Sequence, residues 1–263
     1  MCNHRVEVTI IGSGNVAEAF ARAIAACPTM CLKQIFARNE ARGRTIAEQC
    51  ATQWCDKPEE LASSDIYIIS VSDRAVGELA SQLSFAPGSI VTHTAGSVPL
   101  TELPSNDTHR GILYAFQSFT AGREIEFRGL PLFIEAESEE VYNVLEAFGQ
   151  ALGCRVERAT SERRKVIHLA GVFVNNFVNH LYSMAGEVIS EAELSFDTLR
   201  PLIMETALKA LDSGNPRSVQ TGPAVRGDSV VIERHLEMLG DDSLKAQIYK
   251  LLSDIIWETS KKI

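Results

Sequence analysis

Hydrophobic and polar positions along the chain follow two different patterns. Up to about residue 158, short apolar and β-branched runs alternate with stretches of helical periodicity. The run at 65–71 is continuously apolar, which is typical of a strand covered on both faces of a sheet. Strands are predicted at residues 6–11, 32–37, 65–71, 89–93, 111–116, 130–135 and 154–157. Their alternation with helices predicts an α/β fold with a doubly wound, mostly parallel sheet.

Beyond about residue 160 the strand pattern ends. Helical patterns follow at residues 161–190, 198–212, within 228–239, and from 242 to about 261. Two domains are therefore predicted: a doubly wound domain over residues 1–158 and an all-helical domain over residues 159–263.

The turn after the first predicted strand reads Gly-Ser-Gly-Asn-Val-Ala and leads into a helix near Ala17. Gly12 permits a tight turn, Gly14 lets a pyrophosphate approach the backbone, and Ala17 lets the helix pack on the strand. The preceding strand and the following helix are the context that a Rossmann dinucleotide-binding fingerprint requires. The alternative is an ordinary glycine-rich turn. The predicted cofactor ligands here are Gly12, Ser13, Gly14, Asn15 and Val16.

The second predicted strand ends at Arg38 and Asn39, where an NAD site usually carries an acidic residue. A guanidinium suits a 2′-phosphate, and Asn39 can add a neutral hydrogen bond. The competing acid, Glu40, lies further along and is expected to start the next helix. NADP is therefore predicted in preference to NAD, although Arg38 could also be a solvated surface residue.

Other loops follow the carboxyl ends of the strands, where doubly wound sheets bind ligands. His93 ends the fourth predicted strand, where the nicotinamide half would lie, and is a candidate acid or substrate-orienting group. The alternative is a structural histidine. Further cofactor contacts are predicted from Val71, Ser72, Asp73, Thr94 and Ala95, and substrate contacts from Gln117 and Ser118.

The first long helix of the second part is apolar nearly all round, which predicts that it is buried. One broad stripe of it is nevertheless polar, and comprises Lys165, His168, Asn175, Asn176 and Asn179. Buried polar groups cost free energy unless they are paired, so the stripe predicts a lined cavity or a polar contact with a partner. Satisfied core and interface hydrogen bonds are the alternative.

Particular roles follow for this helix. Lys165 and His168, one turn apart, are candidate catalytic residues, and Asn175 is a candidate substrate ligand. Gly171 would allow close approach by a ligand or another backbone.

The loop at 219–228 is polar and contains glycine between two predicted helices. Thr221 and Gly222 can offer a hydroxyl and N–H groups to a carboxylate, and Arg226 can bind one bidentately. A small anionic substrate is therefore predicted between the domains. The alternative is an interhelical turn with an ion pair from Arg226 to Asp228 and with Asp228 as a helix cap.

Composition narrows the class of protein. A net charge of −9 argues against a nucleic-acid partner, and the chain has no 18-residue apolar run or signal peptide. A cytoplasmic protein without a membrane partner is predicted. The cysteines at 2, 27, 31, 50, 55 and 154 form no Cys-x-x-Cys motif, so buried thiols are expected rather than a metal site. The long apolar helix predicts a homodimer built through the helical domain.

The ordered set of motifs resembles a bacterial family of Rossmann proteins described as NADP oxidoreductases, sometimes coenzyme F420-dependent, whose C-terminal domain is largely uncharacterised. More distantly the chain is similar to pyrroline-5-carboxylate reductase and to the 6-phosphogluconate and 3-hydroxyisobutyrate dehydrogenases. These resemblances imply a helical C-terminal domain that commonly dimerises and a substrate held between the domains. The motifs are Gly-Ser-Gly-Asn-Val-Ala at 12–17, Ala-Arg-Asn at 37–39, His-Thr-Ala-Gly-Ser at 93–97, Phe-Gln-Ser-Phe at 116–119, and Gln-Thr-Gly-Pro at 220–223 followed by Arg226 and Asp228.

The chain departs from these relatives at two places. Hydroxyacid dehydrogenases of this type place a lysine on the first long helix and an asparagine one turn later; Lys165 matches the lysine, but Leu169 stands at the second position. Family members often have His-Pro at 114–115, where this chain has Tyr114 and Ala115.

The predicted function is transfer of hydride between the nicotinamide of NADP and a small carbonyl or imine carbon, with Lys165, His168 or His93 supplying the proton or polarising the oxygen. A non-catalytic NADP-binding regulatory protein and an F420-dependent NADP reductase are the alternatives.

Overall fold

The computed structural model describes residues 5–240 and 243–261. The chain forms two compact units, Met1–Asn176 and Phe177–Ile263. The division falls inside the π-helical segment η4 (Val172–Phe177), because helix α5 (Ser161–Gly171) is grouped with the sheet.

Within the described residues of the first unit, eight strands form one sheet in the order β3-β2-β1-β4-β5-β6-β7-β8. All neighbouring strands run parallel except β6 and β7, which are antiparallel. The predicted doubly wound, mostly parallel sheet is confirmed. The strands are β1 (Val6–Ile11), β2 (Met30–Phe36), β3 (Gln53–Cys55), β4 (Ile66–Ile69), β5 (Ile90–His93), β6 (His109–Ala115), β7 (Pro131–Ala136) and β8 (Arg155–Arg158).

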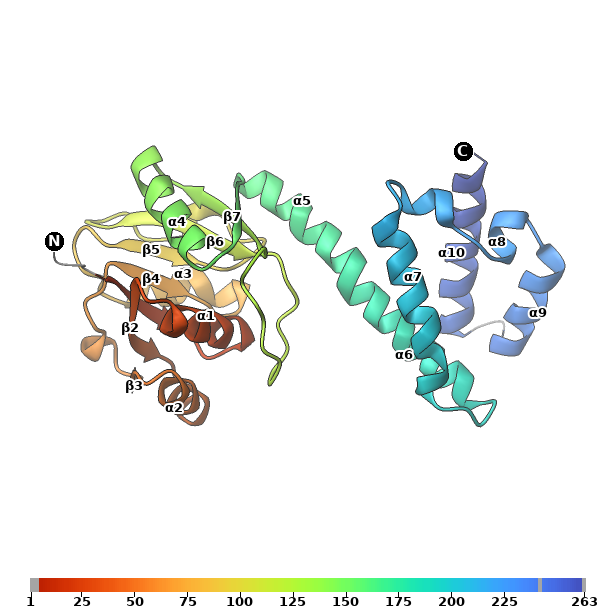
Figure 1. Ribbon diagram of the computed structural model, residues 1–263, viewed down its shortest axis with the longest axis horizontal. Helices are drawn as coiled ribbons and strands as arrows, with labels where there is room; N and C mark the ends of the chain where they lie inside the picture. Colours follow the sequence, from red (N-terminus) through yellow and green to blue (C-terminus); the bar gives the residue numbers. More distant parts are fainter. Residues whose placement is uncertain (1–4, 241–242, 262–263) are drawn as a thin grey trace. The chain divides into compact units, whose positions relative to one another are not determined.

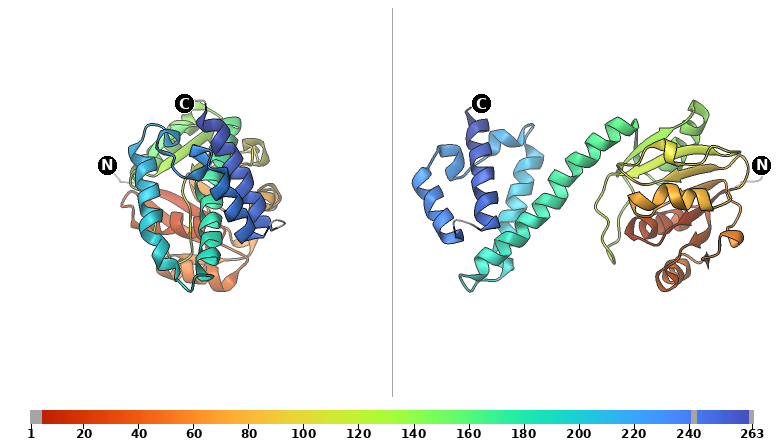
Figure 2. Two further views of the ribbon diagram at one scale, coloured as in Figure 1. Left: turned by 90° about the vertical axis from the view of Figure 1, so that its right-hand side faces the viewer. Right: turned by 180° about the vertical axis from the view of Figure 1, so that it is seen from behind.

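Helices cover both faces of this sheet. One face carries α1 (Asn15–Ala26), α2 (Glu40–Gln49) and α4 (Glu139–Ala151), and the other carries α3 (Val76–Gln82) (Figures 1 and 2). Strand β4 shows why its sequence is continuously apolar. Ile66 and Ile68 join the core under α1, whereas Tyr67 and Ile69 join the core on the α3 side, as the two-residue period of a strand requires.

Short segments account for most differences from the predicted elements. Strand β3 is three residues long, too short for a period-2 pattern to be recognised, and was not predicted. The 3-10 helices are η1 (Pro58–Glu60), η2 (Asp73–Ala75) and η3 (Leu100–Glu102). Segment η2 directly precedes α3, which begins at Val76.

The described part of the second unit is helical, as predicted. Helix α10 packs against α8 and α9, and the ring of Trp257 lies under Gly227, where an added Cβ would come within 2.7 Å of it. In the described parts of the chain, no helix is long and apolar enough to span a membrane. The elements are α6 (Val178–Ser190), η5 (Phe196–Leu199), α7 (Arg200–Asp212), η6 (Pro216–Val219), α8 (Pro223–Arg226), α9 (Ser229–Leu239) and α10 (Leu244–Ser260).

The expected burial of the first long helix is wrong for the single chain. Val166, Leu169 and Val174 are more than half exposed. The buried side of α5 carries Ser161 and Arg164, whereas the apolar Val166 and Leu169 lie on its exposed surface. Thr160 caps this helix: its side-chain oxygen accepts a hydrogen bond from the backbone N–H of Arg163 at 3.2 Å.

A buried arginine fastens α5 to the sheet. The Arg164 side chain is 1 % exposed, and its guanidinium pairs with the carboxylate of Glu135 on β7. Its Nε donates to the carbonyl of Ala95 at 3.3 Å, and another guanidinium nitrogen donates to the carbonyl of Val98. Ser161, one turn earlier, also donates to Glu135, at 2.8 Å. The start of α5 is thus tied to both β7 and the loop after β5.

His93, at the end of β5, is part of the core. Its side chain is fully buried, and its Nδ1 accepts a hydrogen bond from the backbone N–H of Ala95 at 3.2 Å. Burial, with a further contribution from the charge of Arg164, lowers the pKa of His93 from 6.5 to about 4. The imidazole is therefore neutral at physiological pH and is held as a structural group.

Replacing Arg164 with Met is expected to lower the free energy of unfolding by about 3–5 kcal/mol, because the Glu135 carboxylate would lose its buried partner. Its exposed neighbour Arg163 offers a matched control, and Arg163→Met is expected to change stability by less than about 1 kcal/mol. Urea unfolding of the two variants measures both values. Equal losses would contradict the anchoring role of Arg164.

The buried His93 also predicts a pH dependence. Between its unfolded pKa of 6.5 and its folded pKa of about 4, the unfolded chain binds more protons, so stability falls as the pH is lowered. This histidine is expected to account for a loss of about 2 kcal/mol between pH 7 and pH 5. His93→Asn should reduce the difference between urea midpoints at the two pH values, whereas His180→Asn should leave it unchanged. An unaltered difference in His93→Asn would count against this explanation.

Candidate active site

The glycine-rich turn has the geometry that a dinucleotide phosphate needs. Gly12 has a φ of +131°, and any Cβ there would collide with the carbonyl oxygen of Ser70, so only glycine fits. Gly14 is the N-cap of α1 and has no side-chain cap, and an added Cβ would meet nothing within 4 Å. Open space therefore lies before the N-terminus of a 12-residue helix, where backbone N–H groups and the helix dipole favour an anion. The residues present fit a dinucleotide.

A groove of about 690 Å³ runs along the carboxyl edge of the sheet from this turn. Arg38 is exposed on its wall, beyond the end of β2. The side-chain oxygen of Asn39 caps α2 by accepting from the backbone N–H of Arg42 at 3.1 Å, so only its amide nitrogen remains for a ligand. The groove is lined by every predicted cofactor residue: Gly12, Ser13, Gly14, Asn15, Val16, Arg38, Asn39, Val71, Ser72, Asp73, Thr94 and Ala95.

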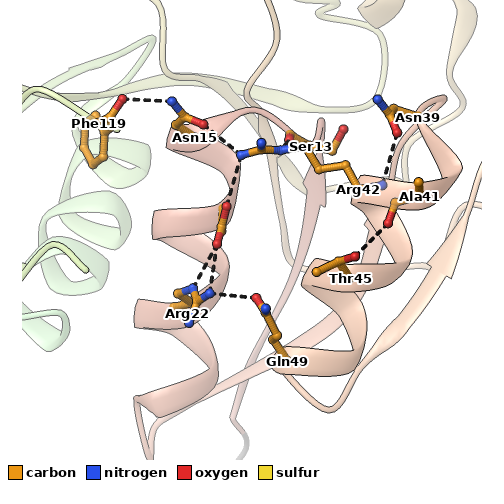
Figure 3. A network of polar contacts seen from close by, with 10 residues as sticks. Ser13, Asn15, Arg22, Asn39, Ala41, Arg42, Thr45, Gln49 and Phe119 are labelled. Atoms are coloured by element: carbon orange, nitrogen blue, oxygen red, sulfur yellow. Dashed lines mark hydrogen bonds and ion pairs between the residues drawn. The ribbon is translucent and has the colours of Figure 1, made fainter. Parts of the chain in front are cut away.

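Arg42, which the sequence did not single out, fastens the glycine-rich turn to α2 (Figure 3). Its guanidinium donates to the carbonyl of Ser13, to the side-chain oxygen of Asn15 at 2.8 Å and to Glu18 at 3.0 Å. The amide nitrogen of Asn15 donates to the carbonyl of Phe119 at 3.0 Å. The network thus joins α1, α2 and the loop after β6 around the turn. In the sequence Arg42 is one of several charged residues on a helix, which provides no distinguishing signal.

A second cavity of about 190 Å³ adjoins the groove, and His168, Tyr114 and Gln117 line both. The predicted substrate residues Gln117, Ser118 and Asn175 lie on its wall together with the predicted catalytic residue His168. Tyr114 was not predicted as a site residue, although it lies near the carboxyl end of β6, where its position could have indicated one. The remaining lining residues are Phe116, Gly171, Val172, Val174 and Asn176.

Close packing sets the position of α5 beside this cavity. An added Cβ at Gly171 would come within 2.8 Å of the Phe116 ring, so this glycine accommodates an aromatic side chain rather than the ligand or second backbone that was expected. At Gly96, an added Cβ would lie 2.6 Å from Nδ1 of His168. The imidazole therefore rests directly on the backbone of the loop after β5.

Two of the predicted catalytic residues lie outside these cavities. His93 is buried beneath the groove and lines neither cavity, so the expectation that it acts on a substrate is corrected to a structural role. Lys165 is exposed and also lines neither cavity. Arg164, its neighbour, faces the sheet instead, because the helix turns by about 100° per residue.

The predicted anion-binding loop belongs to the second unit. Gly222 has a φ of +113°, which requires glycine, and Arg226 is exposed at the end of the short helix α8. Asp228 caps α9 by accepting from the backbone N–H of Val231 at 3.3 Å, as the alternative interpretation expected. The contribution of Thr221, Gly222 and Arg226 to a substrate site stays a prediction.

The cysteines in the described part of the chain form no disulfide. Cys27, Cys31, Cys50, Cys55 and Cys154 are free, and Cys2 lies outside the described residues. Burial raises the pKa of Cys55 and of Cys154 to about 11, so both stay protonated and unreactive. Among the described residues, no three or more His, Cys, Asp or Glu side chains cluster as metal ligands would.

Two known families match successive parts of the chain. Residues 7–96 match the family described as "NADP oxidoreductase coenzyme F420-dependent", and residues 130–256 match the domain of unknown function DUF2520. Among curated proteins, none matches the chain.

Solved structures extend the similarity over nearly the whole chain. A Bacteroides fragilis protein described as "putative NADP oxidoreductase" is 36% identical, with a TM-score of 0.90, over 97% of this chain and 99% of its own. Pyrroline-5-carboxylate reductase from Streptococcus pyogenes is 13% identical, with a TM-score of 0.65, over 99% and 100% of the two chains. A reductive aminase from Aspergillus terreus, solved with NADPH and ethyl levulinate, is 12% identical, with a TM-score of 0.73, over 98% and 94%.

The last two similarities establish the fold alone, whereas the first covers both chains at an identity that establishes kinship. The chain belongs to the family of NADP oxidoreductase-like proteins in which a Rossmann domain precedes a DUF2520 domain.

Proposed function

We propose that the protein is an NADPH-dependent oxidoreductase acting on a small carbonyl or imine compound. The observation that carries the proposal is the position of His168, which lines both the dinucleotide groove and the adjoining cavity. A titratable donor thus stands where a cofactor in the groove would meet a substrate in the cavity. The family match over residues 7–96 supports the same chemistry.

In this proposal, different residues bind the cofactor, donate a hydrogen bond to the reacting atom and orient the substrate. Gly12, Gly14 and the start of α1 would hold the pyrophosphate, and Arg38 the 2′-phosphate. Bound NADPH would supply the hydride. His168 donates a hydrogen bond to the substrate oxygen or nitrogen and stabilises the negative charge that develops there, and solvent water supplies the proton that completes the product. Gln117, Ser118 and Asn175 orient the substrate with neutral hydrogen-bonding groups.

We further propose that the substrate is a small carboxylate and that the protein forms a homodimer through its helical domain. The segment 221–226 offers a hydroxyl from Thr221, an N–H group from Gly222 and a guanidinium from Arg226. This set of groups can bind a carboxylate. Leu202, Met204 and Leu211 of α7 are 62–79 % exposed, an apolar surface that a second copy would cover.

Arg38→Ala is expected to weaken NADPH binding by about 1.5–3 kcal/mol, the scale of a charge-assisted hydrogen bond, and to change NADH binding little. Titration calorimetry with each cofactor measures the difference. Arg44→Ala is the matched control: Arg44 is an exposed arginine of α2 that pairs with Glu40 and does not line the groove, so it should alter neither affinity. Equal losses for NADPH and NADH in Arg38→Ala would contradict the 2′-phosphate role.

Oxidation of NADPH in the presence of small keto acids, aldehydes and cyclic imines tests the reaction itself. His168→Gln should lower kcat by about 10²–10³-fold at an unchanged NADPH affinity, the range typical of a lost hydrogen-bond donor to charge that develops in the transition state. His180→Gln, an exposed histidine on α6, should leave turnover unchanged. Turnover only with reduced F420 would favour the deazaflavin as hydride partner. Tight NADPH binding without any turnover would favour a regulatory protein.

A further inference from the structure

Tyr114 and His168 form a contact that the proposed reaction does not yet explain. The Tyr114 hydroxyl lies 3.1 Å from Nδ1 of His168, and the two rings meet edge to face with centroids 6.0 Å apart. The residues come from different elements, β6 and α5, and are 54 positions apart in the sequence. Both line the groove and the smaller cavity.

We propose that Tyr114 is a positioning residue for His168: its hydroxyl donates to Nδ1, so that the neutral imidazole carries its proton on Nε2 and presents that N–H to the substrate cavity. The contact with Tyr114 by itself sets the tautomer and the orientation of the His168 ring. The catalytic role of that ring rests on the proposed function.

The direction of the hydrogen bond follows from what surrounds the hydroxyl. Tyr114 is 9 % exposed, and among the described residues His168 is the one side chain that hydrogen-bonds its hydroxyl. A buried O–H needs an acceptor, and the unprotonated nitrogen of a neutral imidazole is one. Burial also raises the pKa of the Tyr114 hydroxyl, which keeps its proton available for donation.

Packing fixes which edge of the imidazole is free. An ideal Cβ on Gly96 would lie 2.6 Å from Nδ1 and 2.8 Å from Cγ of His168, so this edge of the ring faces the loop backbone. Nε2 lies across the ring from Cγ and is directed away from both Gly96 and the Tyr114 hydroxyl. The edge that remains for a ligand is therefore the one that carries the proton.

Tyr114 is itself held in place. Its ring stacks on Phe133 with centroids 6.4 Å apart and meets Phe116 edge to face at 6.3 Å. His168 is held from the other side, because Arg164, one turn earlier, anchors α5 to the sheet. A donor whose supporting group is fixed by packing keeps its geometry without reorganisation during the reaction.

A neutral histidine with a defined N–H can polarise a carbonyl oxygen or an imine nitrogen without first being protonated. Although His168 is exposed, its contact with Tyr114 distinguishes it from a freely rotating surface histidine, which exchanges between tautomers and ring orientations. It also accounts for the presence of a hydroxyl at position 114, since a phenyl ring would fill the same space in the core.

The test compares Tyr114→Phe with the wild-type protein by nitrogen NMR of the histidine rings, at a pH where His168 is neutral. The wild-type His168 signal should show a protonated Nε2 and an unprotonated Nδ1, and Tyr114→Phe should shift it toward a mixture of tautomers. The matched control is Tyr142→Phe, which removes a hydroxyl bonded to Glu146 on α4 and should leave the His168 signal unchanged. A wild-type ring protonated on Nδ1, or an unchanged signal in Tyr114→Phe, would overturn the proposal.

Kinetics provide the second readout. Tyr114→Phe should lower kcat roughly tenfold, the equivalent of one hydrogen bond, with NADPH affinity and melting temperature close to wild type. Tyr114→His, which restores a hydrogen-bonding ring at this position, should recover part of the loss. An unchanged kcat in Tyr114→Phe would refute the positioning role. Absence of turnover in the wild type, together with the expected NMR signal, would instead refute the proposed function and leave the tautomer assignment intact.

Discussion

The buried pair of Arg164 and Glu135 is the interaction on which the geometry of the candidate site depends. Helix α5 follows the sheet in the chain, and its apolar side chains Val166 and Leu169 are exposed, so they do little to hold the helix in place. The guanidinium compensates for this by binding β7 and the loop after β5 at once. Burying two charges is unfavourable in isolation, but a pair with several additional hydrogen bonds is strongly specific in position.

The consequences of this anchor extend along the helix. His168 lies one turn after Arg164 and therefore rests on Gly96, in the same loop to which Arg164 is bonded. One further turn brings Gly171 against the ring of Phe116. Each contact is too close for a larger residue at the glycine, so the helix has little freedom to slide. The same contacts that pack α5 against the sheet therefore also position the His168 ring.

A separate network of hydrogen bonds organises the groove beside the glycine-rich turn. Arg42 and Asn15 tie the glycine-rich turn to α2 and to the loop after β6, while the space beside Gly14 stays open. Arg42 is committed to Ser13, Asn15 and Glu18, whereas Arg38 projects from the end of β2 into the groove wall. Two arginines four residues apart thus have different roles, one holding the loop and the other lining the groove.

Local patterns in the sequence were enough to predict the sheet, the set of residues along the groove at its carboxyl edge, and the order of the α/β and all-helical parts. These are set by local patterns: β-branched runs, the glycine spacing and the residues that follow each strand, which a parallel sheet brings to one edge. Residues such as Gly12, Arg38 and Thr94 could therefore be assigned to one groove without coordinates. The periodicity of residues 165–179 also indicated a polar stripe, and His168 and Asn175 of that stripe line a cavity.

Which polar groups line the groove and the cavity, and which are buried in the core, depends on packing that no local pattern reveals. His93 and His168 are both histidines beside the same sheet edge, yet one is enclosed and the other lines the cavity, because burial depends on packing from distant segments. Lys165 and Arg164 are adjacent basic residues, and the rotation of the helix directs the second toward Glu135. Tyr114 could be recognised as part of the candidate site only because its hydroxyl contacts His168. Such pairings join residues far apart in sequence, and no local pattern encodes them.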